Sequence, residues 1–151
     1  MRYVLALAFK FAILLILISC TTQQPSPFST IDRVIPTPVN GQAVASGRVL
    51  SVITGKPIYR VRVAFAEVIR GEGDDAIYVD DGGLTTPSAE TDEDGYFVIS
   101  ALPPKEYVIV VGDPLGPNDV VRNPDTRLPR IWKIEPNQQL DLGEIKVNIG
   151  V

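Results

Sequence analysis

Short runs of apolar residues, many of them β-branched, recur from Gly41 to the C-terminus and alternate with clusters of turn-forming residues. No stretch keeps the spacing of an amphipathic helix for three turns. The pattern instead predicts seven short strands, at residues 43–52, 60–65, 88–91, 96–100, 107–112, 131–134 and 142–149. The sequence therefore predicts an all-β fold.

The second of these strands shows the clearest alternation of side chains. Its apolar face carries Val61, Val63 and Phe65. The opposite face carries Arg60, Arg62 and Ala64. Because successive side chains of a strand point to opposite faces, this pattern predicts a half-buried strand. Further along the chain, Asp94-Gly95 between two β-type runs is a strong hairpin signal.

Residues 1–19 have the layout of an export signal. Arg2 gives a positive start, and residues 11–18 form an uninterrupted apolar run after Lys10. A run of this length suits the core of a signal peptide and is too short to span a bilayer, which takes roughly 20 residues. An uncleaved membrane anchor is the alternative interpretation of the same segment.

The motif Leu17-Ile18-Ser19-Cys20 stands where cleavage is expected, and it resembles the bacterial lipobox. The resemblance implies that Cys20 receives a diacylglycerol on its sulfur, carries further acyl chains such as palmitate, and becomes the mature N-terminus. Several acyl chains give stable membrane anchoring where one does not. Thr21, not Asp, follows the cysteine, which in Gram-negative lipoproteins implies the outer membrane. A free cysteine behind an ordinary signal peptide is the alternative.

Residues 20–40 read as the lipidated cysteine and a flexible tether. Four prolines stand there among Thr, Gln and Ser, a composition that favours extended and weakly ordered backbone. At roughly 3 Å per residue, such a tether holds a domain some tens of Å from the membrane. Ile31, Val34 and Ile35 leave open that part of it docks as an extra strand. The folded domain is expected at residues 41–151.

Composition narrows the chemistry that this chain can perform. Histidine is absent, which excludes catalytic triads and zinc sites that need imidazole. Cys20 is the only cysteine, so an internal disulfide and a multi-thiolate metal cluster are excluded as well. The net charge is −4 and becomes −6 when residues 1–19 are removed. Such a surface repels phosphate backbones, so we expect no nucleic-acid partner.

Six motifs in a fixed order carry a resemblance to a known module. They are Gly47-Arg48-Val49, Thr54-Gly55-Lys56-Pro57-Ile58, Thr91-Asp92-Glu93-Asp94-Gly95-Tyr96-Phe97-Val98-Ile99, Leu102-Pro103-Pro104, Tyr107-Val108-Ile109-Val110 and Asp141-Leu142-Gly143-Glu144-Ile145. Together they resemble the carboxypeptidase regulatory-like domain. The resemblance implies a single seven-stranded sandwich of the transthyretin-like or immunoglobulin-like kind, generally without catalytic activity, that serves as an accessory or interaction domain.

Two positions depart from the pattern of that family. Arg60-Val61 stands where the family usually has Gly-Ala, and Lys105 stands where it usually has Gly before Glu-Tyr. Glycine at such a place commonly adopts a backbone conformation that other residues avoid. We therefore expect Lys105 to be strained or to sit in a different turn.

Ten of the 18 carboxylates lie between Glu67 and Asp94, where Arg70 is the only basic residue. A solvated loop is the ordinary meaning of such a run, and a site for a cation or a basic partner is the functional one. Glu90, Asp92 and Asp94 imitate the first half of a calcium loop, but the twelfth position is Ala101 where a bidentate Glu is needed. We therefore expect a hairpin turn there, with no bound metal and no other cofactor.

Residues 69–87 are the most distinctive part of the chain. Four glycines and five carboxylates predict a mobile and solvated link, in which only residues 77–79 can pair as a short strand. Loops of this length are often functional. We expect partner contacts at Tyr78, Asp80 and Asp81, with a basic surface on the partner.

Aromatic residues offer a second hypothesis. Trp132, with tyrosines such as Tyr59, Tyr96 and Tyr107, could form a stacking platform for a sugar, although core packing is the commoner role of such residues. The sequence therefore predicts a non-catalytic lipoprotein of the cell envelope that contacts another envelope protein. A lipoprotein that binds polysaccharide through aromatics around Trp132 is the alternative.

Replacing Cys20 with Ser tests the lipoprotein hypothesis. We expect the variant to keep its signal segment and to incorporate no labelled palmitate, because the lipobox cysteine is the site of both lipid attachment and cleavage. A variant that is cleaved at the same place and stays membrane-bound contradicts the hypothesis.

Overall fold

The computed structural model describes residues 33–72 and 75–150. Residues 34–151 form one compact unit, and its described part contains nine strands and no helix. Within the described residues, no helix is long and apolar enough to cross a membrane. The export signal, Cys20, Ile31 and most of the tether lie outside the described residues. Val34 and Ile35 are exposed and belong to no strand.

The smaller of the two sheets has three strands in the order β5-β1-β9. They are β5 (Tyr96–Leu102), β1 (Ala43–Ser51) and β9 (Gln139–Val147). The central strand β1 runs antiparallel to β5 and parallel to β9. The first and last strands of the domain therefore lie side by side.

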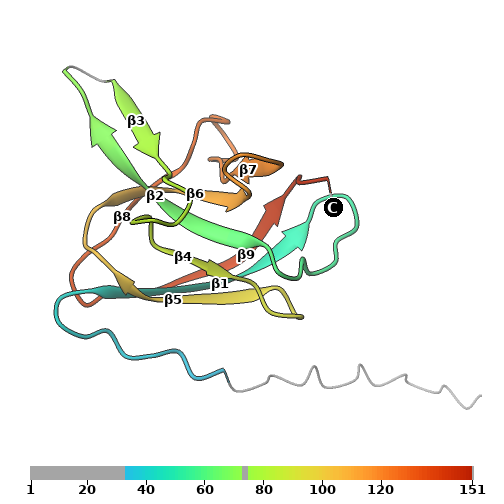
Figure 1. The fold of residues 1–151 in the computed structure, drawn as a ribbon, viewed down its shortest axis with the longest axis horizontal. Coiled ribbons are helices and arrows are strands. Elements are labelled where there is room, and N and C mark those ends of the chain that lie inside the picture. Colours follow the sequence, from blue (N-terminus) through green and yellow to red (C-terminus); the bar gives the residue numbers. More distant parts are fainter. Residues whose placement is uncertain (1–32, 73–74, 151) are drawn as a thin grey trace, which may run out of the picture. The chain divides into compact units, whose positions relative to one another are not determined.

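The larger sheet has six strands around the pair β2 (Arg62–Arg70) and β6 (Glu106–Gly112). β3 (Ala76–Val79) and β4 (Ser88–Glu90) pair with β2, whereas β7 (Asn118–Val120) and β8 (Ile131–Lys133) pair with β6, all of them antiparallel. The β2–β3 hairpin projects beyond the rest of the sheet (Figure 1).

One hydrophobic core lies between the two sheets. Ala45, Val49 and Phe97 reach it from the small sheet, and Phe65 and Tyr107 reach it from the large one. The rings of Phe65 and Tyr107 meet edge to face at 5.7 Å between centroids, a favourable arrangement for aromatic pairs. The expected all-β sandwich is confirmed.

All seven predicted strands are present with shifted ends, and two further strands accompany them. β3 covers the short pairing segment expected at residues 77–79, and β7 lies in a stretch that the sequence left without a strand. The half-buried character predicted for β2 is wrong, because Ala64 and Ala66 on its other face are also fully buried. β2 lies inside the sheet, and these two alanines face the longer Val110 and Val108 across to β6.

Arg60-Val61 and Lys105 depart from the family pattern, and a strained backbone is present at the first of these positions only. Arg60, at a glycine position of that pattern, has φ of 54°. Lys105 is not among the described residues with positive φ, so a different turn accommodates it. Arg60 thus takes the left-handed conformation that glycine would adopt more readily.

Gly95 is required by both conformation and space. Its φ is 80°, and a Cβ atom built on it would lie 2.6 Å from the carbonyl oxygen of Val49. The Asp94-Gly95 turn therefore packs directly against β1, where a side chain at residue 95 would collide. Gly47 of β1 shows a similar constraint, because its added Cβ would lie 3.1 Å from the ring of Phe97.

Thr91 connects two of the four places where the chain crosses between the sheets, the crossings after β1 and after β4. Its buried hydroxyl donates a hydrogen bond to the carbonyl of Ile58 at 2.7 Å and accepts one from the amide of Val61 at 3.0 Å. Its backbone amide donates to Val61, and its carbonyl accepts from Arg60. The β1–β2 connection is thereby fixed to the segment between β4 and β5.

Replacing Thr91 with Val tests this connection. Val keeps the shape of Thr but leaves a buried amide and a buried carbonyl without a partner, so we expect a loss of about 2 to 4 kcal/mol in the free energy of unfolding. Thr91→Ser keeps the hydroxyl and removes one methyl, for a loss of about 1 kcal/mol. Denaturant unfolding measures both, and equal losses would show that the hydroxyl does not matter.

Candidate functional site

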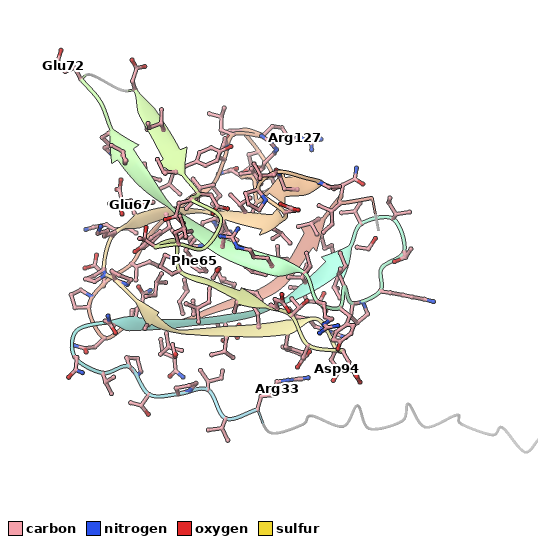
Figure 2. The ribbon with its side chains drawn as sticks, viewed as in Figure 1. Arg33, Phe65, Glu67, Glu72, Asp94 and Arg127 are labelled. Atoms are coloured by element: carbon pink, nitrogen blue, oxygen red, sulfur yellow. The ribbon has the colours of Figure 1, made fainter. Side chains whose placement is uncertain are left out.

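Two surfaces at opposite edges of the six-stranded sheet carry the residues that the sequence singled out. Tyr78, Asp80 and Asp81 belong to the edge formed by β3, whereas Trp132 lies in β8 beside β6. The structure therefore does not bring these residues together. Figure 2 shows the same separation, with Glu72 at the outer end of the β2–β3 hairpin and Arg127 on a different loop.

The first surface is the arm, by which we mean the β2–β3 hairpin from Val68 to Val79. Ile69 and Ile77 pair across the two strands and share a face, and Tyr78 pairs with Val68 on the other face. All four residues of β3 are exposed, including Ile77 at 64%, Tyr78 at 43% and Val79 at 42%. The arm thus presents apolar side chains to solvent along an edge strand.

A small cavity of about 240 Å³ continues the apolar face of the arm towards the core. Ile69 and Val79 line its outer side, and Phe65 and Tyr107 line its inner side. Lys105 and Glu67 close part of the rim with an ion pair at 2.7 Å. Burial raises the pKa of the Tyr107 hydroxyl to about 12, and that hydroxyl donates to the carbonyl of Pro103. Tyr107 is therefore a neutral packing residue.

Asp80 serves the fold of the loop that follows the arm. Its two carboxylate oxygens each accept a hydrogen bond of 2.7 Å from the guanidinium of Arg62, and both side chains are largely buried. This bidentate pair lowers the pKa of Asp80 and raises that of Arg62. The pair fixes the loop against β2.

Asp81 stabilises the same loop through hydrogen bonds to residues within it. Its carboxylate accepts hydrogen bonds from the hydroxyl of Thr85 and from the backbone amides of Gly83, Thr85 and Thr86. These bonds hold the pKa of Asp81 well below its ordinary value. The link expected over residues 69–87 is exposed along β3, as predicted, but it is not irregular throughout, because residues 69–70 and 76–79 belong to strands and these capping bonds shape the turn after β3.

The weak calcium candidates serve a turn. One oxygen of Asp92 accepts the amides of Asp94 and Tyr96, and its carbonyl accepts the amide of Gly95. Glu90 is exposed on β4, opposite Arg62. Across residues 33–72 and 75–150, no three carboxylate or cysteine side chains gather in a way that could hold a metal ion.

The second surface is a groove of about 730 Å³ between β9 and the segment that joins β7 to β8. Val121, Trp132, Leu140 and Leu142 form its apolar floor and pack against the core. The guanidinium of Arg130 lies over the ring of Trp132, 4.8 Å from its centroid. One face of the indole is therefore covered by a guanidinium, and that face is not available for a sugar ring to stack on.

The other aromatic candidates form no exposed surface with Trp132, although Tyr107 is its cross-strand partner. Tyr107 is buried in the core, Tyr59 stands in the β1–β2 connection, and Tyr96 lies on β5 beneath the guanidinium of Arg48. The arrangement is not the shared platform that the carbohydrate hypothesis requires.

Sequence analysis singled out Trp132 but missed the three arginines of the same groove, Arg122, Arg127 and Arg130. A signal was available, because residues 121–133 contain four basic residues and one acidic residue in a chain whose net charge is −4.

Neither a family model nor a curated protein matches the chain. Several solved structures are similar in fold. A 9R-lipoxygenase from Cyanothece PCC8801 is 20% identical over 78% of this chain, with a TM-score of 0.40, and the chain spans only 18% of its length. The dioxygenase domain of a dioxygenase carbohydrate-binding protein fusion from Streptomyces sp. SirexAA-E is 17% identical, with 85% of this chain and 97% of that one covered and a TM-score of 0.41.

The 5-hydroxyisourate hydrolase of Klebsiella pneumoniae is 16% identical, with 76% of this chain and 91% of that one covered and a TM-score of 0.36. These proteins include enzymes of two unrelated reaction classes. At such identities and TM-scores, none of their activities is assigned to this chain.

The Asp80–Arg62 pair predicts an acid-dependent stability. Because the folded state lowers the pKa of Asp80, the pair stabilises the protein above the ordinary Asp pKa of about 3.9 and loses its effect as the pH falls below it. We expect Asp80→Asn to be less stable at pH 7 and to flatten the decline in stability between about pH 4.5 and 2.

A double-mutant cycle with Arg62→Met separates the pair from its surroundings. Denaturant unfolding at pH 7 should give a coupling free energy of about 1 to 2 kcal/mol for a largely buried bidentate pair. A coupling near zero would show that the loop does not depend on it.

Proposed function

We propose that the chain is a lipid-anchored module of the cell envelope that binds another protein and catalyses no reaction. The lipobox resemblance of residues 17–20 supports an anchor on Cys20, in the outer membrane where the organism has one. The resemblance of the β domain to accessory modules supports an interaction role.

The observation that carries the interaction role is the exposed arm. Edge strands expose unpaired backbone groups, and natural proteins usually protect them with charge, proline or a covering segment. β3 instead exposes Ile77, Tyr78 and Val79. Contiguous apolar side chains on an unprotected edge are typical of a surface that another chain covers, and strand addition to a free edge is a common mode of such binding.

The charged residues around the arm indicate which kind of surface the partner presents to it. Glu67 pairs with Lys105 and Arg70 with Glu106 at 2.8 Å, and Asp80 and Asp81 hold the adjoining loop. The base of the arm is thus electrically balanced, and apolar contact with β3 supplies most of the affinity.

The roles of the acidic side chains also support a chain that catalyses no reaction. The chain has no histidine, and Asp80, Asp81 and Asp92 each stabilise a turn or loop through the hydrogen bonds described above. These carboxylates do not face one another across a cleft, which is the arrangement that acid–base hydrolysis of glycosides requires.

A photo-crosslinking residue at position 77 tests the proposal in the membrane-anchored, full-length chain. We expect Ile77 and Val79 to give the same discrete protein adduct in the native envelope. Leu115 is the matched control, because it is apolar and 99% exposed but lies between β6 and β7. A crosslinking residue at position 115 should therefore give no adduct with this partner.

Ile69→Asp in the same chain should reduce the adduct at Val79 about tenfold, since losing one apolar contact and burying a charge costs at least about 1.4 kcal/mol. An adduct pattern that is identical at positions 77 and 115, or the absence of any adduct at 77 and 79, contradicts the proposed interaction surface.

A further inference from the structure

The groove beside β9 has an apolar floor at the open side of the sandwich. β9 is the last strand of the small sheet, and β7 and β8 lie at the edge of the large one. Val121, Trp132, Leu140 and Leu142 are half-buried there and extend the core to the surface. An apolar side chain from outside can therefore contact the core without unfolding any element.

The rim of the groove carries arginines that the local backbone holds in place. The side-chain oxygen of Asn123 accepts the amide of Asp125 at 2.9 Å, and the carbonyl of Asn123 accepts the amide of Arg127. Arg127 has φ of 61°, a conformation that non-glycine residues adopt at a cost. The guanidinium of Arg122 donates to the carbonyl of Arg127 across the same turn. The turn thus presents Arg122, Arg127 and Arg130 together.

The carboxylates that line the groove are already engaged. Asp119 accepts the amides of Val120 and Asn148, and Asp141 accepts the amide of Gly143. Glu144 forms an ion pair with Arg48 at 3.5 Å on the other side of β9. The acids of the groove therefore serve the fold.

The basic side chains of the groove form no ion pair with these carboxylates. In the described parts of the chain, the ion pairs join Arg48, Arg62, Arg70, Lys105 and Lys133 to carboxylates, and Arg122, Arg127, Arg130 and Lys146 take part in none of them. All four of these basic residues are exposed and line the groove. The groove lining thus carries four basic residues against the three carboxylates of Asp119, Asp141 and Glu144, and Glu144 already pairs with Arg48, so positive charge is in excess at this site of an acidic protein.

We propose that this groove binds an extended acidic segment of a partner protein, with its backbone along the free edge of β9 and its carboxylates on Arg122, Arg127 and Arg130. Guanidinium groups bind carboxylates in a bidentate, directional way. Alternating side chains of the bound segment enter the apolar floor, because successive residues of a strand point to opposite sides.

Two observations favour a peptide over an anionic polysaccharide. Among the described residues, β9 pairs with β1 alone, and the strand edge that this leaves matches a polypeptide backbone and has no counterpart in a sugar chain. The Arg130 guanidinium covers one face of the Trp132 indole, on which a sugar ring would otherwise be able to stack. The groove lies at the opposite edge of the large sheet from the arm, so this second site is independent of the interaction proposed for β3.

Trp132 gives a direct way to test the proposal, because it is the only tryptophan of the chain and lies in the groove. The full-length chain in detergent is titrated with the synthetic peptide Glu-Val-Glu-Thr-Glu-Val-Glu while tryptophan fluorescence is recorded. We expect a saturable change that weakens as salt is raised. The peptide Lys-Val-Lys-Thr-Lys-Val-Lys should give no change.

Matched variants separate the arginines of the groove from general charge effects. Arg122→Gln with Arg127→Gln should weaken binding at least tenfold. Arg70→Gln with Lys105→Gln removes the same number of charges at the opposite edge and should leave the affinity within twofold. Circular dichroism and melting temperature verify that both variants are folded. Equal weakening by the two pairs would overturn the proposal.

Two further probes decide what the groove recognises. Glu-Pro-Glu-Thr-Glu-Pro-Glu keeps the charges but lacks two backbone donors and resists strand pairing, so it should bind at least tenfold more weakly. Polygalacturonate and inorganic phosphate should compete poorly at equal charge concentration. If the proline peptide binds as well as the first, or if polygalacturonate competes better than the peptide, the site is a general polyanion surface and the proposal is wrong.

Discussion

The hydrogen bonds of Thr91 are the constraint on which the rest of this structure depends. The chain passes from the small sheet to the large one after β1, and from the large sheet to the small one after β4. Thr91 joins these two passages through its hydroxyl, its amide and its carbonyl. Buried polar groups are costly when unpaired and specific when paired. One residue therefore holds two of the four crossings between the sheets together, at the end of the sandwich where β2 begins.

Local patterns in the sequence predicted the strands, because a strand with one buried face shows its alternation wherever it lies. The ordering of residues 80–87 could not be predicted in this way. It depends on Arg62, which is distant along the chain, and the pattern of carboxylates alone suggests solvation. β7 was missed for a related reason, since Asn118, Asp119 and Val120 show no alternation and pair only because β6 lies beside them.

In the candidate sites, too, the sequence identified individual residues, whereas their neighbours come from distant parts of the chain. Tyr78 and Trp132 were found from residue type, and both lie on the surfaces where the sequence analysis expected partners. Their roles followed from neighbours that only the fold supplies. Asp80 and Asp81 stabilise their own loop, Arg130 covers Trp132, and the basic turn at residues 122–130 faces β9 across the groove. The result is a sandwich with an apolar edge on one side and a basic groove on the other.

The parallel pairing of β1 with β9 has a consequence for how the protein reaches its folded state. Val44 pairs with Gln139 and Ser51 with Val147, so β1 completes its pairing only after β9 has been synthesised. Contacts between such distant segments form slowly and late. β1 therefore lacks one of its two neighbours until β9 is in place. The topology makes closure of the small sheet a late step that depends on contact between the first and last strands of the described domain.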